Sequence, residues 1–222
     1  MIRIKNITKI LGSNPVIDNV SLDIENGEIL GLVGINGAGK STFSRCFCGL
    51  EKCGQIFYKG KKYKPKDRLN TCYMVMQEVN HQLFTESVEE EIRISMEKED
   101  SDIMEILGQL DLENFRERHP MSLSGGQKQR TAIATALASG REILFMDEPT
   151  SGLDLKHMLE VSKLLKQLYA AGHTVCVITH DLELLLECCT DVIHFRNGTI
   201  CEQYAMDETG LEKIRKFFLR TY

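Results

Sequence analysis

The residues of this chain that are best suited to chemistry form one glycine-rich run, which reads Gly34, Ile35, Asn36, Gly37, Ala38, Gly39, Lys40, Ser41, Thr42. The run fits the pattern G-x-x-x-x-G-K-[ST] of a phosphate-binding loop. Its glycines let backbone N–H groups converge on phosphate oxygens, a geometry that a Cβ would obstruct. Lys40 can then reach the terminal phosphates, and the Ser41 hydroxyl can ligate Mg²⁺. The alternative interpretation is a glycine-rich turn between a strand and a helix.

The residues around this run predict the strand–loop–helix setting that a phosphate-binding loop requires. Residues 28–33 form a near-continuous apolar stretch, as expected of a buried strand. A helix should begin near Lys40. A phosphate in the loop would then lie at a helix N-terminus, where the helix dipole favours negative charge.

A second glycine motif contains the pair Gly125 and Gly126, which Ser124 and Gln127 flank, and we call it the second glycine pair. We expect a helix to begin around Gly126 and to end at Gly140, because glycine is a common helix terminator. A glycine pair that opens a helix predicts a second anion site.

Acidic and imidazole groups follow two later strands. Asp147 and Glu148 come directly after a strand expected at residues 142–146, and His180 follows a strand expected at residues 174–179. A carboxylate at the end of a strand can polarise an attacking water, and a positioned base typically contributes about 10²–10⁴-fold in rate. The alternatives are a turn start for the acidic pair and an ordinary loop residue for the histidine.

Composition excludes several classes of protein. With 222 residues and a formal net charge of -5, the chain can bury one sizeable α/β core, and a nucleic-acid partner is not expected. No apolar run approaches the roughly 18 residues of a membrane span, and the first residues alternate like a strand instead of forming a signal peptide. Eight cysteines without an export route predict reduced thiols in a cytosolic protein, and no spacing completes a familiar zinc site.

The order of the remaining elements predicts an α/β fold. Further short strands are expected at residues 1–8, 20–24 and 72–76. Residues 78–122 are acidic with apolar residues at helical spacing, so we interpret them as an inserted helical subdomain that includes the approach to the second glycine pair. The whole chain, residues 1–222, is then a single domain.

With these motifs in order, the chain resembles the nucleotide-binding subunit of ATP-binding-cassette (ABC) transporters over nearly its whole length. The matching segments are Walker A (34–42), the Q-loop residue Gln77, the family signature (123–127), Walker B (143–148), the D-loop (151–154) and the switch histidine His180. One such match is weak, but six in this order and spacing are specific. The resemblance implies an α/β fold with a P-loop NTPase core, a mostly parallel sheet, N-terminal antiparallel strands and the inserted helical subdomain.

The resemblance also assigns roles in ATP hydrolysis. Lys40, Glu148 and His180 would be the catalytic residues, and Mg²⁺ would be held by Ser41, Gln77 and Asp147. The nucleotide would be bound by a larger set, which comprises Gly34, Ile35, Asn36, Gly37, Ala38, Gly39, Lys40, Ser41, Thr42, Gln77, Ser124, Gly125, Gly126, Gln127 and Asp154.

Two partners are implied by the same resemblance. In the family, the signature of one cassette binds the ATP held by the Walker A loop of a second cassette, and Asp154 would cross that interface. Both half-sites look intact, so pairing with itself and pairing with a related chain are equally permitted. An integral membrane transporter subunit is the other partner, and it would place this chain peripherally at the cytoplasmic face of the cell membrane.

A narrower resemblance, to the energy-coupling-factor and cobalt-type importer ATPases, lies in residues 77–88. Those proteins usually read Q-N-P-D-D-Q-hydrophobic-F, and this chain departs where Asn80 and His81 replace the two aspartates. The agreeing residues are Gln77, Gln82, Leu83 and Phe84. That group docks arginine-bearing helices of a membrane subunit here, and complementary charge would come from Glu78, Glu86, Glu89, Glu90 and Glu91. The alternative is an ordinary solvated acidic helix face.

We therefore expect an ATPase that powers an importer of vitamins or metal ions. An exporter, a soluble ABC protein and a nucleotide-binding module without turnover are the alternatives. One departure concerns the base: the position of the aromatic residue that usually stacks on adenine is Leu11, and residues 1–42 contain no Phe, Tyr, Trp or His. Base–aromatic stacking is worth about 1–3 kcal/mol, so we predict weakened discrimination between ATP and GTP.

Overall fold

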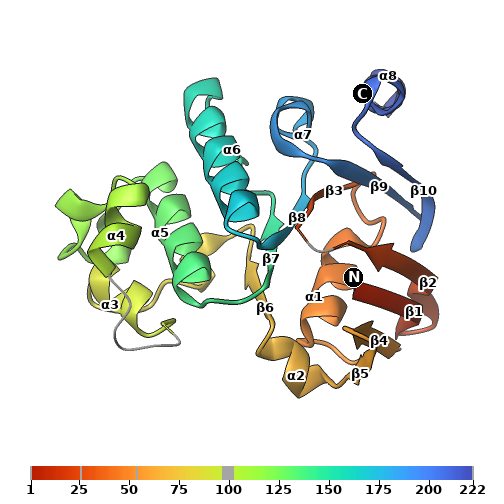
Figure 1. The fold of residues 1–222 in the computed structure, drawn as a ribbon, viewed down its shortest axis with the longest axis horizontal. Helices are drawn as coiled ribbons and strands as arrows, with labels where there is room; N and C mark the ends of the chain where they lie inside the picture. Colours follow the sequence, from red (N-terminus) through yellow and green to blue (C-terminus); the bar gives the residue numbers. More distant parts are fainter. Residues whose placement is uncertain (1, 26, 54, 97–102, 222) are drawn as a thin grey trace.

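The computed structural model describes residues 2–25, 27–53, 55–96 and 103–221. A central sheet runs through the molecule (Figure 1). A second sheet and helix α1 (Lys40–Cys48) lie on one side of it, and helices α6 (Leu155–Ala170) and α7 (Leu182–Cys188) lie on the other. A further group of helices extends beyond one edge of the central sheet.

The central sheet has six strands and is parallel except at one edge. Its spatial order is β10 (Thr199–Ala205), β9 (Asp191–Arg196), β3 (Ile29–Val33), β8 (Thr174–Ile178), β7 (Ile143–Asp147) and β6 (Cys72–Val75). Only β10 runs antiparallel to its neighbour, β9. The prediction of a mostly parallel sheet in an α/β fold is therefore confirmed.

The second sheet is antiparallel and begins with the N-terminal strands, as expected. Its order is β2 (Asn14–Ile24), β1 (Ile2–Leu11), β4 (Gln55–Tyr58) and β5 (Lys61–Tyr63). The first two strands are longer than the sequence suggested, because a tight turn at Gly12, with φ +65°, joins them directly. The strands β4 and β5 were not expected.

Burial explains why the central strands read as continuous apolar runs. Every residue of β3, β7 and β8 is buried, since both faces of the sheet are covered. Leu30 and Leu32 belong to the core shared with α1 and the second sheet, whereas Ile29 and Val33 belong to the core shared with α6 and α7.

Aromatic contacts fix α1 on the central sheet. The ring centroids of Phe43 and Phe195 are 5.1 Å apart, and those of Phe47 and Phe145 are 4.9 Å apart. Such pairs add to the apolar burial of a helix. The helix that follows the glycine-rich loop is thus held rigidly over the strands that carry the other predicted site residues.

The remaining helices are α2 (Pro65–Leu69), α3 (Val88–Arg93), α4 (Ile103–Gln109), α5 (Gly125–Ala138) and α8 (Glu208–Thr221). Three of them, α3, α4 and α5, pack together through buried apolar residues such as Ile92, Leu107 and Ile133. The proposal that residues 78–122 are an inserted subdomain of a single domain stays a prediction, and residues 97–102 of that segment lie outside the described residues. Among the helices that the structure describes, none has the length and apolar character to cross a membrane.

Candidate nucleotide site

A hollow of about 390 Å³ lies where the glycine-rich loop meets the carboxyl ends of β7 and β8. The loop follows β3, and because β3, β8 and β7 are parallel neighbours, residues beyond their ends gather at one edge of the sheet. The predicted site residues that line this hollow are Asn36, Gly37, Ala38, Gly39, Lys40, Ser41, Thr42, Gln77, Asp147, Glu148 and His180.

Two tight approaches explain the glycines of the loop. Gly34 has φ +152°, and a Cβ there would lie 2.2 Å from the carbonyl oxygen of Phe195. Gly39 has φ +104°, and a Cβ there would lie 2.7 Å from the carbonyl oxygen of Val16. Helix α1 begins directly after Gly39, so the positive end of its dipole lies at the hollow.

Lys40 is buried inside the loop, with 8% of its surface exposed. Its Nζ donates to the carbonyl oxygens of Gly34 at 2.6 Å and Ile35 at 3.2 Å, so these two residues hold the lysine although they do not line the hollow. Burial lowers the pKa of Lys40, and the nearby Glu148 and Asp147 oppose this shift. The loop carbonyls carry only partial negative charge. A bound phosphate would place a full negative charge beside the buried ammonium.

Asp147 and Ser41 form a place that suits a hard cation. Asp147 is 6% exposed, and its Oδ1 is buried without a hydrogen-bond partner in the described part of the chain. Burial raises the pKa of Asp147, while a hydrogen bond with Ser41 opposes the shift. Buried carboxylate oxygens are seldom left unpartnered, and carboxylate, hydroxyl and amide oxygens are ligands that Mg²⁺ accepts. With Gln77 lining the same hollow, the residues present fit Mg²⁺.

Glu148 and His180 are brought into contact by the pairing of β7 with β8. His180 Nδ1 lies 2.9 Å from Oε1 of Glu148, whose side chain is 11% exposed. Glu148 has φ +51°, a left-handed conformation that is uncommon for residues other than glycine. Its N–H donates to the carbonyl oxygen of Ile178 at 2.8 Å, which holds this conformation against β8. Backbone strain of this kind is typical of sites where one side chain must be aimed.

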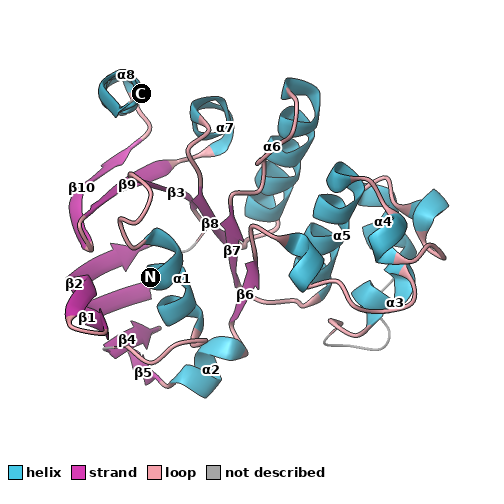
Figure 2. Cartoon of the chain, turned by 180° about the vertical axis from the view of Figure 1, so that it is seen from behind, coloured by secondary structure: helices cyan, strands magenta, loops and turns pink. Residues whose placement is uncertain are grey.

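The residues of the second glycine pair lie elsewhere. Ser124, Gly125, Gly126, Gln127 and Asp154 line a separate hollow of about 620 Å³, which meets the first only through Gln77. Figures 1 and 2 place α5, which begins at Gly125, and α1 on opposite sides of β6 and β7. One chain therefore does not bring the second anion site to the first.

Within this second hollow, the polar side chains are engaged with their own helices. Ser124 Oγ accepts from Gln127 N at 3.3 Å, and Gln127 Oε1 accepts from Ser124 N at 2.9 Å, which makes a capping box on α5. Asp154 caps α6 by accepting from His157 N at 3.0 Å, and its side chain is 67% exposed.

The segment after β6 presents one large apolar side chain to solvent. Phe84 is 75% exposed. Of the five glutamates expected to offer charge beside it, Glu91 is 3% exposed, and its Oε2 accepts from the N–H groups of Phe84 and Thr85, both at 2.9 Å. Glu89 is also engaged, since it pairs with Arg93 and Arg116. The exposed acidic residues here are Glu78, Glu86 and Glu90.

Sequence reasoning missed two residues of the first hollow. Val16 of β2 and Ile178 of β8 line it. Val16 carried no local signal, because its contact arises from the folding of the second sheet over the loop. Ile178 could have been found as the last apolar residue before His180.

Comparison with known proteins agrees with this arrangement. Residues 17–151, more than half of the chain, match the family described as ABC transporter. The chain belongs to this family. The resemblance to ATP-binding cassettes that was inferred from the sequence is confirmed.

The relatives of the chain are named as ATP-binding proteins of ABC transporters and importers. A putative ABC transporter ATP-binding protein of Treponema denticola is 45% identical over 203 residues, which are 90% of this chain and 42% of that protein. The methionine import ATP-binding protein MetN of Desulfitobacterium hafniense is 34% identical over an alignment 244 residues long, which covers 100% of this chain and 72% of that protein. The chain spans about two fifths of the length of its Treponema denticola relatives.

Solved structures share the fold. A dimeric ATP-binding cassette in a post-hydrolysis state, bound to ADP and Pi, has a TM-score of 0.82 at 28% identity, with 93% of this chain and 99% of that chain covered. The cbiO1 protein of Clostridium perfringens, part of the ABC transporter complex cbiONQ, has a TM-score of 0.86 at 27% identity, with 99% and 94% covered. Members of the family thus bind adenine nucleotides and form dimers.

Proposed function

We propose that this cassette binds ATP with Mg²⁺ and hydrolyses it, paired with a second cassette, to power a membrane transporter. The pair of Glu148 and His180, held 2.9 Å apart beside buried Lys40, is the observation that carries the proposal. Hydrolysis of a phosphoanhydride needs positive charge on the phosphates, a metal and an aligned water. This hollow contains residues suited to each need.

The phosphates would be held by the loop and by Lys40. The ammonium of Lys40, now bound to the carbonyls of Gly34 and Ile35, would turn to the terminal phosphate oxygens. Ser41, Gln77 and Asp147 would hold Mg²⁺, which supplies positive charge to the phosphate oxygens when bound.

Glu148 would act on the attacking water. Its carboxylate would orient the water and accept its proton, and its strained backbone fixes where the carboxylate lies. In the tautomer with the proton on Nδ1, His180 would donate to Oε1 of Glu148 and would keep the carboxylate aimed at the phosphate.

Replacement of Glu148 tests this assignment. In Glu148→Gln, we expect phosphate release to fall by at least about 100-fold, because the amide cannot accept the proton, while ATP binding is kept. Glu187→Gln is the matched control, since Glu187 lies in a surface ion pair with Lys166 at 3.2 Å. Hydrolysis at the wild-type rate in Glu148→Gln would contradict the assignment.

The second cassette is supported by the separation of the two hollows. Because Ser124 to Gln127 lie away from the loop in one chain, their helix N-terminus is free to meet a phosphate held by another cassette. The side chain of Ser124 already points at the start of α5, where it caps the helix. In such a dimer, the first hollow of one cassette and the second hollow of the other would bind the same nucleotide.

Coupling to a membrane subunit is supported by the segment after β6. Phe84 stands exposed on backbone that the buried Glu91 fixes, and Glu78, Glu86 and Glu90 are exposed in the same segment. A basic, amphipathic helix of a membrane protein suits this surface. The related MetN and cbiO1 proteins belong to a methionine importer and to the cbiONQ complex, so we propose an importer, of vitamins or metal ions, at the cytoplasmic face of the membrane.

Purification from membranes tests the coupling. Tagged Glu148→Gln, extracted gently with ATP present, should carry along a multi-span membrane protein, and Phe84→Asp should lose it because a buried charge is costly at the interface. Leu219→Asp, at an 83% exposed position of α8, is the control. Recovery of the cassette without any membrane protein would contradict transport coupling, and an exporter as the captured protein would contradict the importer assignment.

A further inference from the structure

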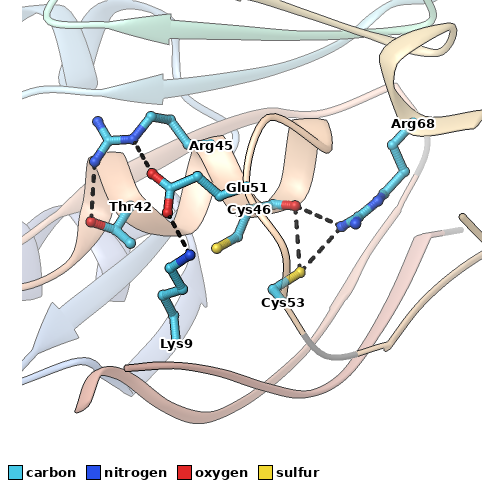
Figure 3. A network of polar contacts seen from close by, with 7 residues as sticks. All are labelled: Lys9, Thr42, Arg45, Cys46, Glu51, Cys53 and Arg68. Carbon is cyan, nitrogen blue, oxygen red and sulfur yellow. Dashed lines mark hydrogen bonds and ion pairs between the residues drawn. The ribbon is translucent and has the colours of Figure 1, made fainter. Parts of the chain in front are cut away.

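Two cysteines and a buried arginine lie in contact at the C-terminal end of α1, the helix whose N-terminus faces the nucleotide site (Figure 3). Cys46 lies in α1, Cys53 lies in the segment that follows this helix, and Arg68 comes from α2. Cys46 is fully buried, Cys53 is half-buried, and Arg68 is 2% exposed. The ATPase assignment uses none of these three side chains.

Arg68 is a buried cation that contacts a thiol where a carboxylate would be expected. Its Nη1 donates to the carbonyl oxygen of Cys46 at 2.6 Å and to Sγ of Cys53 at 3.3 Å. Its Nε is buried without a hydrogen-bond partner, and within the described residues no carboxylate pairs with it. A buried guanidinium needs a counter-charge nearby. The sulfur of Cys53 is the group in contact that can supply one.

The second thiol strengthens this assignment. A hydrogen bond from the Cys46 thiol, together with Arg68, lowers the pKa of Cys53 to about 6, and the same bond and burial raise the pKa of Cys46. In its thiol form, Cys53 donates to the carbonyl oxygen of Cys46 at 3.5 Å, and in its thiolate form it accepts from Arg68. Lys9 and Glu51 are the other charged side chains that face the pair.

We propose that Cys53 is a peroxide-reactive thiolate and that Cys46 converts its oxidised form into a disulfide. The Cys53 sulfur attacks hydrogen peroxide, an S–O bond forms, the O–O bond breaks, and the released hydroxide takes up a proton to become water. Cys53 is thereby oxidised to a sulfenic acid and the peroxide is reduced. The Cys46 sulfur then attacks Cys53, the S–S bond forms, the S–O bond breaks, and the hydroxide leaves with the Cys46 proton as a second water.

A second network of polar contacts runs from the segment that carries Cys53 to the phosphate loop. Glu51, in the same segment as Cys53, accepts from Arg45 Nε at 2.8 Å and pairs with Lys9 at 3.0 Å. Arg45 Nη2 in turn donates to Oγ1 of Thr42 at 3.3 Å, and Figure 3 shows these contacts in one view. The oxidised cysteines would therefore lie in a segment that contacts the loop through Glu51 and Arg45. The chemistry of the cysteines does not depend on the proposed transport function.

Alkylation rates test the thiolate. At pH 6, iodoacetamide should modify Cys53 about tenfold faster than Cys201, because a larger thiolate fraction outweighs the weaker nucleophilicity of a low-pKa thiol. Cys201 is the internal control, since it is the more exposed thiol and lies in β10, away from the cluster. Faster modification of Cys201 than of Cys53 would overturn the proposal. This comparison uses the native chain and needs no variant to fold.

Peroxide treatment tests the disulfide. Reduced protein treated with one equivalent of hydrogen peroxide should yield a peptide that joins Cys46 to Cys53, and a dithiol should reverse it. In Cys46→Ser, Cys53 should instead be trapped as the sulfenic acid by dimedone. In Cys53→Ser no linked peptide should form, whereas Cys201→Ser should behave like the native chain. A reduced Cys53 after treatment, or a disulfide between other cysteines, would overturn the proposal.

Discussion

The two hollows differ in how complete they are within one chain. In the first, Lys40 follows the loop after β3, and Asp147, Glu148 and His180 lie at the carboxyl ends of β7 and β8, so that all four line one hollow. Lys40 already contacts the loop, and His180 already contacts Glu148. In the second, Ser124 and the D-loop carboxylate Asp154 satisfy their own helices and face an open hollow. We therefore expect the first hollow to bind a phosphate within one chain, and the second to act only when a partner covers it.

This difference predicts which hollow ATP binding requires and which hollow is needed in addition for ATP hydrolysis. Charge that is already gathered in a buried site binds an anion with little reorganisation, here the turn of the Lys40 ammonium from the loop carbonyls to the phosphate. Helix N-termini that face solvent bind weakly until a partner excludes water. One chain should thus bind ATP through the first hollow and hydrolyse it only after a second cassette covers it.

The largest expected effect separates the two hollows by mutation. Lys40→Ala and Ser124→Arg should each lower hydrolysis by about 100-fold or more, because each removes or blocks one anion-binding group of the composite site. Only Lys40→Ala should also lose ATP binding by the isolated chain, measured by equilibrium titration. If Ser124→Arg lost ATP binding equally, the two hollows would not be separable in the way proposed.

A smaller effect concerns Leu11, the residue at the position where the family usually carries an aromatic side chain that stacks on the base. Leu11 is 52% exposed near the turn between β1 and β2, and it offers no ring to a base. Leu11→Tyr should strengthen ATP binding by about 1–3 kcal/mol through stacking, while the native chain should bind ATP and GTP within a few-fold of one another. Ile10→Tyr, at the adjacent exposed position, is the control. A native chain with a strong ATP preference would show that another group reads the base.

The smallest effect concerns stability. Burial raises the pKa of Asp147, so the folded state disfavours its charged form, and stability falls as pH rises from about 4 through the raised pKa. Asp147→Asn should therefore stabilise the nucleotide-free chain by about 1 kcal/mol at pH 7 and remove this part of the pH dependence. Urea unfolding between pH 4 and pH 7 measures both, with Asp23→Asn, in a surface pair with Arg3, as the control. A destabilised Asp147→Asn would contradict the account of an unpartnered buried charge.

Much of the fold could be predicted, because its central strands are buried on both faces. All five residues of β8 are buried, and so are all five of β7, and each strand contains four consecutive apolar residues. The strands β4 and β5 gave no such signal, since Lys59, Lys61 and Lys62 interrupt any alternation near a sheet edge. Helix α7 did carry a signal, namely Asp181, whose Oδ1 accepts from the N–H groups of Glu183 and Leu184.

In the site, too, some features could be predicted from the sequence and others could not. The loop could be identified from sequence because its function depends on local spacing, with Lys40 directly after a glycine. The left-handed backbone of Glu148 depends on the neighbouring strand and could not be predicted. The contact of Cys53 with Arg68 joins residues from two segments, and the helix that carries Arg68 has only five residues.

Mixing two inactive variants tests the central claim, that each working site is shared by two cassettes. Lys40→Ala retains the second hollow, and Ser124→Arg retains the first, so a mixed dimer holds one intact composite site. Equimolar mixing should restore hydrolysis to about a quarter of the native rate, because half of randomly formed dimers are mixed and each has one working site of two. No recovery after mixing, with each variant folded, would contradict a site shared between two copies of this chain.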